Sequence, residues 1–145
     1  MAELTAEGGL EEILALLRAD GGRITPARRA VVATLVGGDE HLSADDITGR
    51  IQAVLPDVQV STVYRCLDAL ERLGVVEHVH LGHGPSMYHL SDRQHVHLLC
   101  RRCGQVIEVP ADYLRRLSDR LGSDYGFVLE PRHFALLGTC SDCGD

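Results

Sequence analysis

Four of the five cysteines lie in two Cys-x-x-Cys pairs, and no other feature of the sequence constrains the fold as strongly. The first pair is Cys100 and Cys103, and the second is Cys140 and Cys143, with 36 residues between the pairs. Each pair is followed at once by a glycine, which favours the tight turn of a thiolate metal site. Four thiolates fill the tetrahedral shell of Zn²⁺, so the pattern predicts a structural zinc ion that closes a small domain. The alternative is a pair of redox dithiols or unrelated buried thiols.

Charge and hydropathy limit the classes of protein to which the chain can belong. The 145 residues carry a net charge of -7 at pH 7, so any DNA contact must be local rather than a general positive attraction. All 14 basic residues are arginine, which can bind phosphate or guanine through two parallel hydrogen bonds. No apolar run approaches the roughly 20 residues of a membrane span, and no leader-like segment follows Met1. We therefore expect a cytoplasmic protein without a membrane partner, whose cysteines bind metal rather than form disulfides.

The first half of the chain predicts helices followed by a β-hairpin. Apolar residues recur at helical spacing in the stretches 10–19, 27–36, 43–55 and 62–73, and β-like runs follow at 75–81 and 86–90. This order of elements is typical of a winged helix-turn-helix.

Local signals mark where these helices begin. Thr25 before Pro26 is typical of a helix start, and Ser43 with Asp46 three residues later forms a capping box. We expect Ser61 to cap the last of these helices. In the third helix, the buried stripe is predicted to be Ile47, Ile51 and Val54.

The second half predicts a smaller domain with strands around one helix. Strands are expected at 95–100, 105–109 and 134–138, with a helical run at 113–121. The fold class is therefore α+β, a winged helix-turn-helix domain at residues 1–91 followed by a small α/β dimerisation domain at 92–145.

Histidines recur in a pattern that favours metal binding. His95 and His97 flank one residue of an expected strand, and because side chains alternate with a period of two, both imidazoles lie on one face. His78 and His80 repeat this arrangement in the first strand of the hairpin. A four-coordinate site needs further ligands, and the candidates are His41, His89 and His133. Alone, each of these three is more typical of a solvated or hydrogen-bonded side chain, as is His83 at the hairpin tip.

The chain resembles the ferric uptake regulator family over nearly its whole length. The motifs that carry the resemblance are Arg23-Ile24-Thr25-Pro26-x-Arg28, His41-x-Ser43-Ala44-Asp45-Asp46-Ile47, Val60-Ser61-Thr62-Val63-Tyr64-Arg65, His95-x-His97-Leu98-x-Cys100-x-x-Cys103-Gly104 and Cys140-x-x-Cys143. The resemblance implies a transcriptional repressor, not an enzyme, that binds AT-rich inverted repeats in double-stranded DNA as a homodimer and takes no small-molecule substrate. It also implies a regulatory metal site between the two domains, with ligands His41, His89, His95 and His97. Gln94 is the alternative to His89 for the fourth position.

The wing histidines resemble those of the nickel uptake regulators of actinobacteria. In that branch two wing histidines and a late histidine, here His78, His80 and His133, are implied to hold a second regulatory metal. The expected regulatory ion is therefore Ni²⁺, with zinc- or iron-responsive repression as the alternative, because imidazoles suit several divalent transition metals.

A further site, which iron and zinc sensors of the family often carry, is not expected here. The corresponding ligand positions hold Gln94, Val96 and Arg115, none of which suits a metal.

Six residues are the candidates for DNA contact, four of them in the first turn and a half of the expected recognition helix, where side chains reach base edges in the major groove. Tyr64 can contact thymine methyl groups and Arg65 can contact guanine or phosphate. The alternative for Tyr64 is an aromatic residue at the edge of the core. The full set is Arg23, Arg28, Ser61, Thr62, Tyr64 and Arg65.

Two other classes of protein compete with a repressor. A zinc hydrolase needs an open coordination position and a general base, but no His-Glu-x-x-His or His-x-Glu motif occurs. A metal buffer or redox-sensing thiol protein would not need a recognition helix, and Cys66 is more typical of a small core residue than of a sensor thiol. A peroxide sensor is disfavoured because no carboxylate was expected among the histidines.

Overall fold

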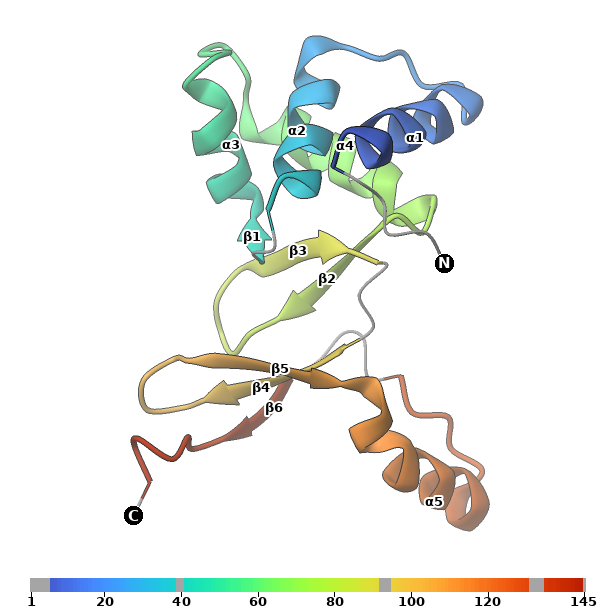
Figure 1. Ribbon diagram of the computed structural model, residues 1–145, viewed down its shortest axis with the longest axis vertical. Coiled ribbons are helices and arrows are strands. Elements are labelled where there is room, and N and C mark those ends of the chain that lie inside the picture. The colour runs from blue at the N-terminus through green and yellow to red at the C-terminus, as the bar shows by residue number, and fades with distance from the viewer. Residues whose placement is uncertain (1–5, 39–40, 92–94, 131–134, 145) are drawn as a thin grey trace. The chain divides into compact units, whose positions relative to one another are not determined.

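The computed structural model describes residues 6–38, 41–91, 95–130 and 135–144, and the chain divides into two units (Figure 1). The first unit comprises Met1–Glu77 and Met87–Asp92, and the second comprises His78–Ser86 and Arg93–Asp145. Among the helices in these ranges, none is both long and apolar enough to cross a membrane.

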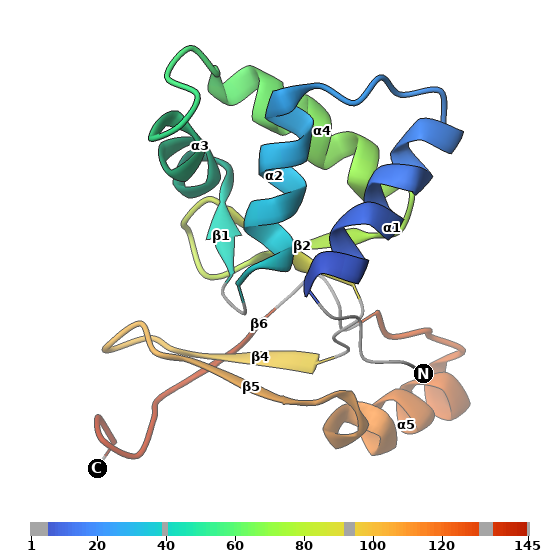
Figure 2. The same ribbon diagram turned by 45° about the horizontal axis from the view of Figure 1, so that its top comes forward.

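Four helices form the first unit, and α2 is central to it. The helices are α1 (Ala6–Ala19), α2 (Pro26–Val36), α3 (Ala44–Gln52) and α4 (Val60–Arg72). Figure 2 shows α1 and α3 on either side of α2, with α4 behind it, and α2 contacts all three. The fully buried side chains at their centre are Leu14, Leu17, Val31, Val32, Ile47, Val63, Leu67 and Leu70. Leucine, valine and isoleucine at helical spacing thus build one continuous apolar core, as the sequence predicts.

Two predicted helix starts are confirmed. The Thr25 hydroxyl accepts a hydrogen bond from the Arg28 backbone N–H at 3.2 Å, and Pro26 is the first residue of α2. The Ser43 hydroxyl accepts from the Asp46 N–H, while the Asp46 carboxylate accepts from the Ser43 N–H, both at 3.0 Å. Each cap satisfies backbone donors that the helix itself leaves without acceptors.

Loss of the α3 capping box is expected to be measurable in a denaturant titration. Ser43→Ala should lower the free energy of unfolding by ~1 kcal/mol, because the Asp46 backbone N–H in the first turn of α3 loses the Ser43 hydroxyl that accepts its hydrogen bond. Ser61→Ala is the matched control, since no cap hydrogen bond forms at the start of α4, and it should change stability by less than ~0.5 kcal/mol. Equal losses for the two variants would contradict this account.

The same capping box has a defined pH dependence. The backbone and side chain of Ser43 hydrogen-bond the Asp46 carboxylate and hold its pKa below the usual range. A lowered folded-state pKa stabilises the protein above the unfolded pKa of about 4, and that stabilisation disappears as the pH falls through the folded value.

Two details of the helix predictions are wrong. Gln59, not Ser61, precedes α4, so Ser61 lies inside the first turn and does not cap it. Val54 lies beyond the end of α3 at Gln52 and is 81% exposed, whereas Ile47 and Ile51 are buried as expected. The helix stops before the apolar stripe is complete because residues 53–54 form a turn ahead of Pro56.

A small sheet follows the helices in the fold. Its strands are β1 (Leu42–Ser43), β2 (Val76–His80) and β3 (Ser86–Leu90), in the order β1-β3-β2. The β2–β3 hairpin is the predicted wing, and β1 was not expected from the sequence. Leu42 pairs with Tyr88 and Ser43 pairs with Met87 in antiparallel register. This register places the start of α3 beside the wing.

Within its described residues, the second unit contains a three-stranded sheet and one α-helix, in addition to residues 78–86 of the hairpin. Strand β4 (His95–Cys100) lies between β5 (Val106–Pro110), which is antiparallel to it, and β6 (Ala135–Gly138), which is parallel. A short 3-10 turn, η1 (Ala111–Leu114), leads into α5 (Arg115–Tyr125). The fold class is therefore confirmed as α+β, with a helical unit and a small α/β unit.

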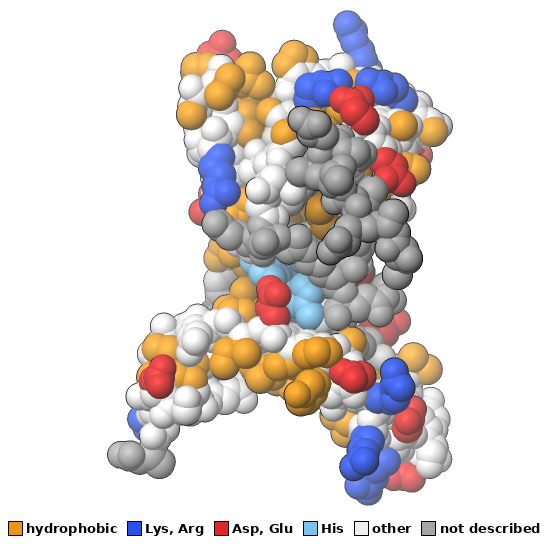
Figure 3. Space-filling view, viewed as in Figure 1, with side chains coloured by type: hydrophobic (Ala, Val, Ile, Leu, Met, Phe, Trp, Pro, Cys, Tyr) orange, Lys and Arg blue, Asp and Glu red, His pale blue; other side chains and the backbone are white. Residues whose placement is uncertain are grey.

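The second unit exposes a large share of its apolar side chains. Figure 3 shows hydrophobic side chains gathered along β5. In the strands and α5 these exposed residues are Val106, Ile107, Leu117, Tyr125, Leu136 and Leu137. An apolar face of this kind is typical of a surface that a partner covers.

Candidate metal centres and DNA-contacting surface

The four paired cysteines come together in the second unit. Their sulfur atoms all lie within 4.8 Å of one another, and the Cys103 and Cys140 sulfurs are 3.7 Å apart. A zinc ion with four Zn–S bonds of ~2.3 Å would separate its sulfurs by ~3.8 Å. The turn after Cys103 requires Gly104, whose φ of +77° suits glycine. The donor set, the spacing and the turn all fit a closed zinc site.

Backbone amides favour the thiolate form at this cluster. The N–H groups of Cys103 and Cys140 hydrogen-bond the Cys100 sulfur and lower the pKa of the Cys100 thiol to about 6. At Cys143 the adjacent sulfurs of Cys140 and Cys103 raise the thiol pKa. Four close thiols therefore cannot all ionise readily on their own, and a bound cation is the usual means of stabilising such a cluster.

His95 and His97 share one face of β4, as their spacing predicts. Their rings are 4.5 Å apart, and the two Nε2 atoms approach within 3.0 Å. His97 is only 1% exposed. Two imidazole nitrogens directed at one point are suited to a shared metal ion, with metal–nitrogen bonds of ~2.0–2.1 Å.

A carboxylate that the sequence interpretation missed lies in the same place. Glu108 on β5 is directly opposite His97 in the antiparallel register, and its Oε1 is 3.6 Å from the His95 Nε2. Cross-strand neighbours on one face are normally in contact. The signal was a glutamate in an otherwise apolar strand, but the sequence alone does not give the register that brings it to the histidines.

The first unit carries a second histidine pair, His41 and His89, with ring centroids 4.8 Å apart. The register that pairs Leu42 with Tyr88 accounts for this, because one further step along both strands brings His41 opposite His89. The His89 Nδ1 lies 3.0 Å from the Leu90 carbonyl oxygen. An N–H donated from Nδ1 to a carbonyl fixes the ring and leaves Nε2 with the lone pair that a metal ligand needs.

The wing histidines also form a pair. His78 and His80 on β2 have ring centroids 5.3 Å apart, and the His80 Nδ1 lies 3.5 Å from the Ser86 hydroxyl. Their predicted partner His133, like the alternative ligand Gln94, lies outside the residues that the structure describes.

The candidate DNA contacts lie in the first unit. Ser61, Tyr64 and Arg65 are exposed on α4, with Tyr64 43% exposed, while Thr62 is half-buried. Arg23 is exposed in the connection between α1 and α2, and Figure 3 shows blue arginine side chains gathered over that end of the unit. Arg28 is half-buried. Exposure of Tyr64 argues against the alternative that it only completes the core.

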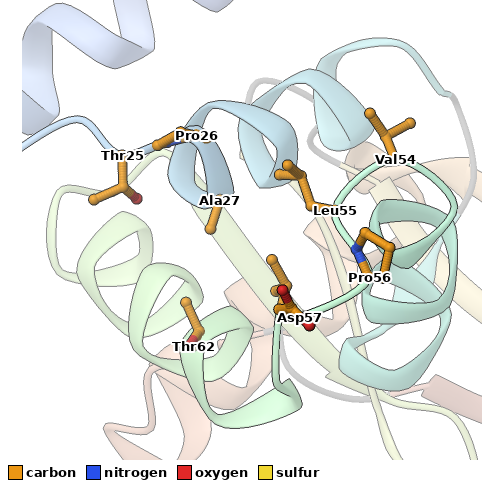
Figure 4. Close-up of a pocket in the computed structure, with 9 residues that line it drawn as sticks. Thr25, Pro26, Ala27, Val54, Leu55, Pro56, Asp57 and Thr62 are labelled. Carbon is orange, nitrogen blue, oxygen red and sulfur yellow. The ribbon is translucent and has the colours of Figure 1, made fainter.

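A pocket of about 470 Å³ lies between the start of α2 and the start of α4. Figure 4 shows Thr25, Pro26 and Ala27 on one side of it, with Thr62 and Asp57 on another. The first turns of the two helices therefore border a single opening. This arrangement places the start of α2 and the start of α4, the predicted recognition helix, around the same opening.

A winged-helix unit joined to a small α/β unit with clustered cysteines and histidines defines a class of metal-responsive transcriptional regulators. The model of the ferric uptake regulator family matches residues 19–136, and the chain belongs to that family. Members of the family are dimeric DNA-binding regulators rather than enzymes.

Relatives of known type support this placement. The chain is 30% identical over 145 residues to the peroxide-responsive repressor PerR of Staphylococcus saprophyticus, and the match covers 99% of this chain and 98% of the relative. It is similar to the Helicobacter pylori ferric uptake regulator, whose structure has three functional metal-binding sites, with a TM-score of 0.79, 25% identity and coverage of 99% and 97%. The Pseudomonas aeruginosa ferric uptake regulator with manganese gives a TM-score of 0.68, 27% identity and coverage of 88% and 97%.

Proposed function

We propose that the chain is a metal-dependent transcriptional repressor that binds operator DNA as a homodimer when nickel occupies its histidine sites. It would thereby control genes of metal uptake and homeostasis. The observation that carries the proposal is a preorganised pair of imidazoles in each unit, with ring separations of 4.8 Å in one and 4.5 Å in the other. The cysteine cluster would hold structural Zn²⁺ separately from this regulation.

The proposal assigns one regulatory ion to both histidine pairs. The ligands would be His41 and His89 from the winged-helix domain (residues 1–91) and His95 and His97 from the dimerisation domain (92–145). An ion with ligands from both domains stabilises only those arrangements in which all of the ligands reach it. Its binding free energy then favours one relative arrangement of the domains, which is how occupancy could control DNA affinity. The hydrogen bond of His89 supports this residue over Gln94 as the fourth ligand.

The assignment of nickel rests on the second histidine site. His78 and His80 are adjacent on β2, and His133 would complete three imidazole ligands. Imidazoles without thiolates suit Ni²⁺, although zinc and iron(II) remain the alternatives within the same family.

A peroxide-responsive regulator is a second candidate, and a specific observation favours it. The sequence interpretation disfavoured it because no carboxylate was expected among the histidines, but Glu108 lies 3.6 Å from His95. A carboxylate among imidazoles suits iron(II), and the relative from Staphylococcus saprophyticus is named as a peroxide-responsive repressor. Hydrogen peroxide would then act on the iron-loaded protein.

The partners that we propose are a second copy of the chain and an AT-rich inverted repeat in double-stranded DNA, within the cytoplasm. The exposed apolar residues of β5, β6 and α5 offer the dimer surface. A two-fold dimer presents two recognition helices, so a two-fold operator matches its symmetry.

The test is operator binding by protein that retains its cysteine-bound zinc and is free of other metal. Nickel, zinc, iron(II) and manganese are added in turn, and DNA binding is measured against free metal concentration. We expect nickel to activate binding at the lowest free concentration, and His78→Ala with His80→Ala to raise that concentration. Activation by zinc alone at sub-nanomolar free metal would overturn the nickel assignment. Loss of binding by the iron-loaded protein on treatment with peroxide would support the second candidate instead.

A further inference from the structure

Arg28 makes contacts different from those of the other arginines near the start of α2. Its Nη1 donates a hydrogen bond to the Arg23 carbonyl oxygen at 3.1 Å, back across the turn that connects α1 to α2. Arg28 is half-buried, whereas Arg23 is exposed and Arg29 pairs with Glu11 at 2.8 Å on the surface. The guanidinium of Arg28 is therefore directed toward the protein backbone.

The turn that Arg28 contacts is built closely around it. The Gly22 N–H donates to the Leu17 carbonyl at 2.9 Å, which closes the end of α1. A Cβ atom on Gly22 would lie 2.6 Å from the Arg28 Nη1 and 2.8 Å from the Leu17 oxygen. These separations are too short for a side chain, so the guanidinium occupies the space beside Gly22.

Arg28 belongs to α2, which packs against the proposed recognition helix α4. Burial raises the pKa of the Cys66 thiol on α4 to about 11, and the positive charge of Arg28 acts on it in the opposite direction. The charge of Arg28 thus acts on a residue of α4, while its guanidinium contacts the turn that carries Arg23.

We propose that Arg28 is a positioning residue, which fixes the turn that presents Arg23 to the operator backbone and does not itself contact the DNA. The inference rests on the proposed function for the role of Arg23. The hydrogen bond to the Arg23 carbonyl and the packing over Gly22 restrict the backbone at residues 22–23. A long exposed side chain on a restricted backbone loses less conformational freedom when it binds phosphate.

The test is a pair of double-mutant cycles in operator affinity at saturating metal. The first cycle combines Arg28→Ala with Arg23→Ala, and the second combines Arg28→Ala with Arg65→Ala as the matched control. We expect Arg28→Ala to weaken binding about as much as Arg23→Ala, roughly fivefold, and to add less than about twofold in the Arg23→Ala background. In the Arg65→Ala background, Arg28→Ala should still weaken operator binding by its full roughly fivefold. Arg65→Ala should weaken binding without changing metal uptake.

The salt dependence of binding distinguishes positioning from contact. A residue that binds phosphate contributes about one to the slope of log affinity against log salt concentration. For the double variant Arg23→Ala with Arg28→Ala, the magnitude of this slope should therefore be smaller by about one than for the unchanged protein. A decrease of about two in the slope would overturn the proposal, because it would mean that both arginines bind phosphate. Additive effects of Arg28→Ala and Arg23→Ala on operator affinity would also overturn it, as would an equal effect of Arg28→Ala in the Arg23→Ala and Arg65→Ala backgrounds.

Amide hydrogen exchange tests the same inference without DNA. In Arg28→Ala the Gly22 amide is expected to exchange at least about fivefold faster, because the turn opens more often. Gly22→Ala should reproduce both the faster exchange of the turn and the loss of affinity if Arg28→Ala does not fold. Unchanged exchange would overturn the positioning role, whereas absence of operator binding with every metal would instead contradict the proposed function.

Discussion

Replacement of Cys140 by serine is expected to remove the bound zinc and to unfold the second unit. Among the described residues of that unit, the buried apolar side chains are only Val79, Val96, Cys100 and Leu114. Such a thin core cannot offset the conformational entropy of its strands without a further cross-link. We expect the zinc content to fall from about one ion per chain to near zero, and the midpoint of thermal unfolding to fall by more than about 10 °C.

Cys66→Ala is the matched control for this experiment. Cys66 is buried on α4 in the first unit, and burial keeps its thiol protonated, so its loss should leave the zinc content unchanged. Zinc content is measured by elemental analysis and unfolding by circular dichroism. A Cys140→Ser protein that keeps its zinc and its unfolding midpoint would show that the cysteine cluster is not a structural metal site.

The second large effect is expected at His97. His97→Ala should weaken binding of the regulatory metal by at least about 100-fold and abolish the metal-dependent gain in operator affinity. The reason is that the Nε2 of this buried side chain lies 3.0 Å from that of His95, so one ion needs both. Metal affinity is measured by competition with a chelator, and operator affinity by fluorescence anisotropy.

His83→Ala is the control for His97→Ala, because His83 is exposed at the tip of the wing and is not paired with another ring in the proposal. It should retain metal affinity. Glu108→Gln extends the comparison: a larger loss of affinity for iron(II) than for nickel, each measured relative to the unchanged protein, would show that the carboxylate is a ligand for the harder ion. Metal-dependent DNA binding that survives in His97→Ala would contradict the assigned regulatory site.

Apart from the cysteine quartet, the features that the sequence predicted correctly are mostly set by neighbouring residues. Thr25 before Pro26 and Ser43 before Asp46 start their helices through hydrogen bonds that span three residues. The pairs His95–His97 and His78–His80 follow from the alternation of side chains along a strand. These short-range rules act before the chain has any tertiary structure.

The features that were missed depend on contacts between distant segments. Strand β1 exists because Leu42 pairs with Tyr88, 46 positions further on, and a two-residue strand has no periodicity of its own. Glu108 reaches the histidines through the β4–β5 register. The inward direction of Arg28 depends on Gly22 and on the end of α1. No pattern within one segment encodes such pairings.

The separation of the two cysteine pairs has a consequence for the order in which the protein forms during synthesis. The apolar core of the first unit is complete once Leu90 has emerged from the ribosome, so that unit can fold while translation continues. The cluster of four cysteines cannot close until Cys140 and Cys143 have also emerged, and until then the earlier thiols of Cys100 and Cys103 are open to oxidation or to competing metals. If the cluster holds zinc as we propose, a cell short of zinc would accumulate chains in which the first unit is folded and the proposed dimerisation unit is not.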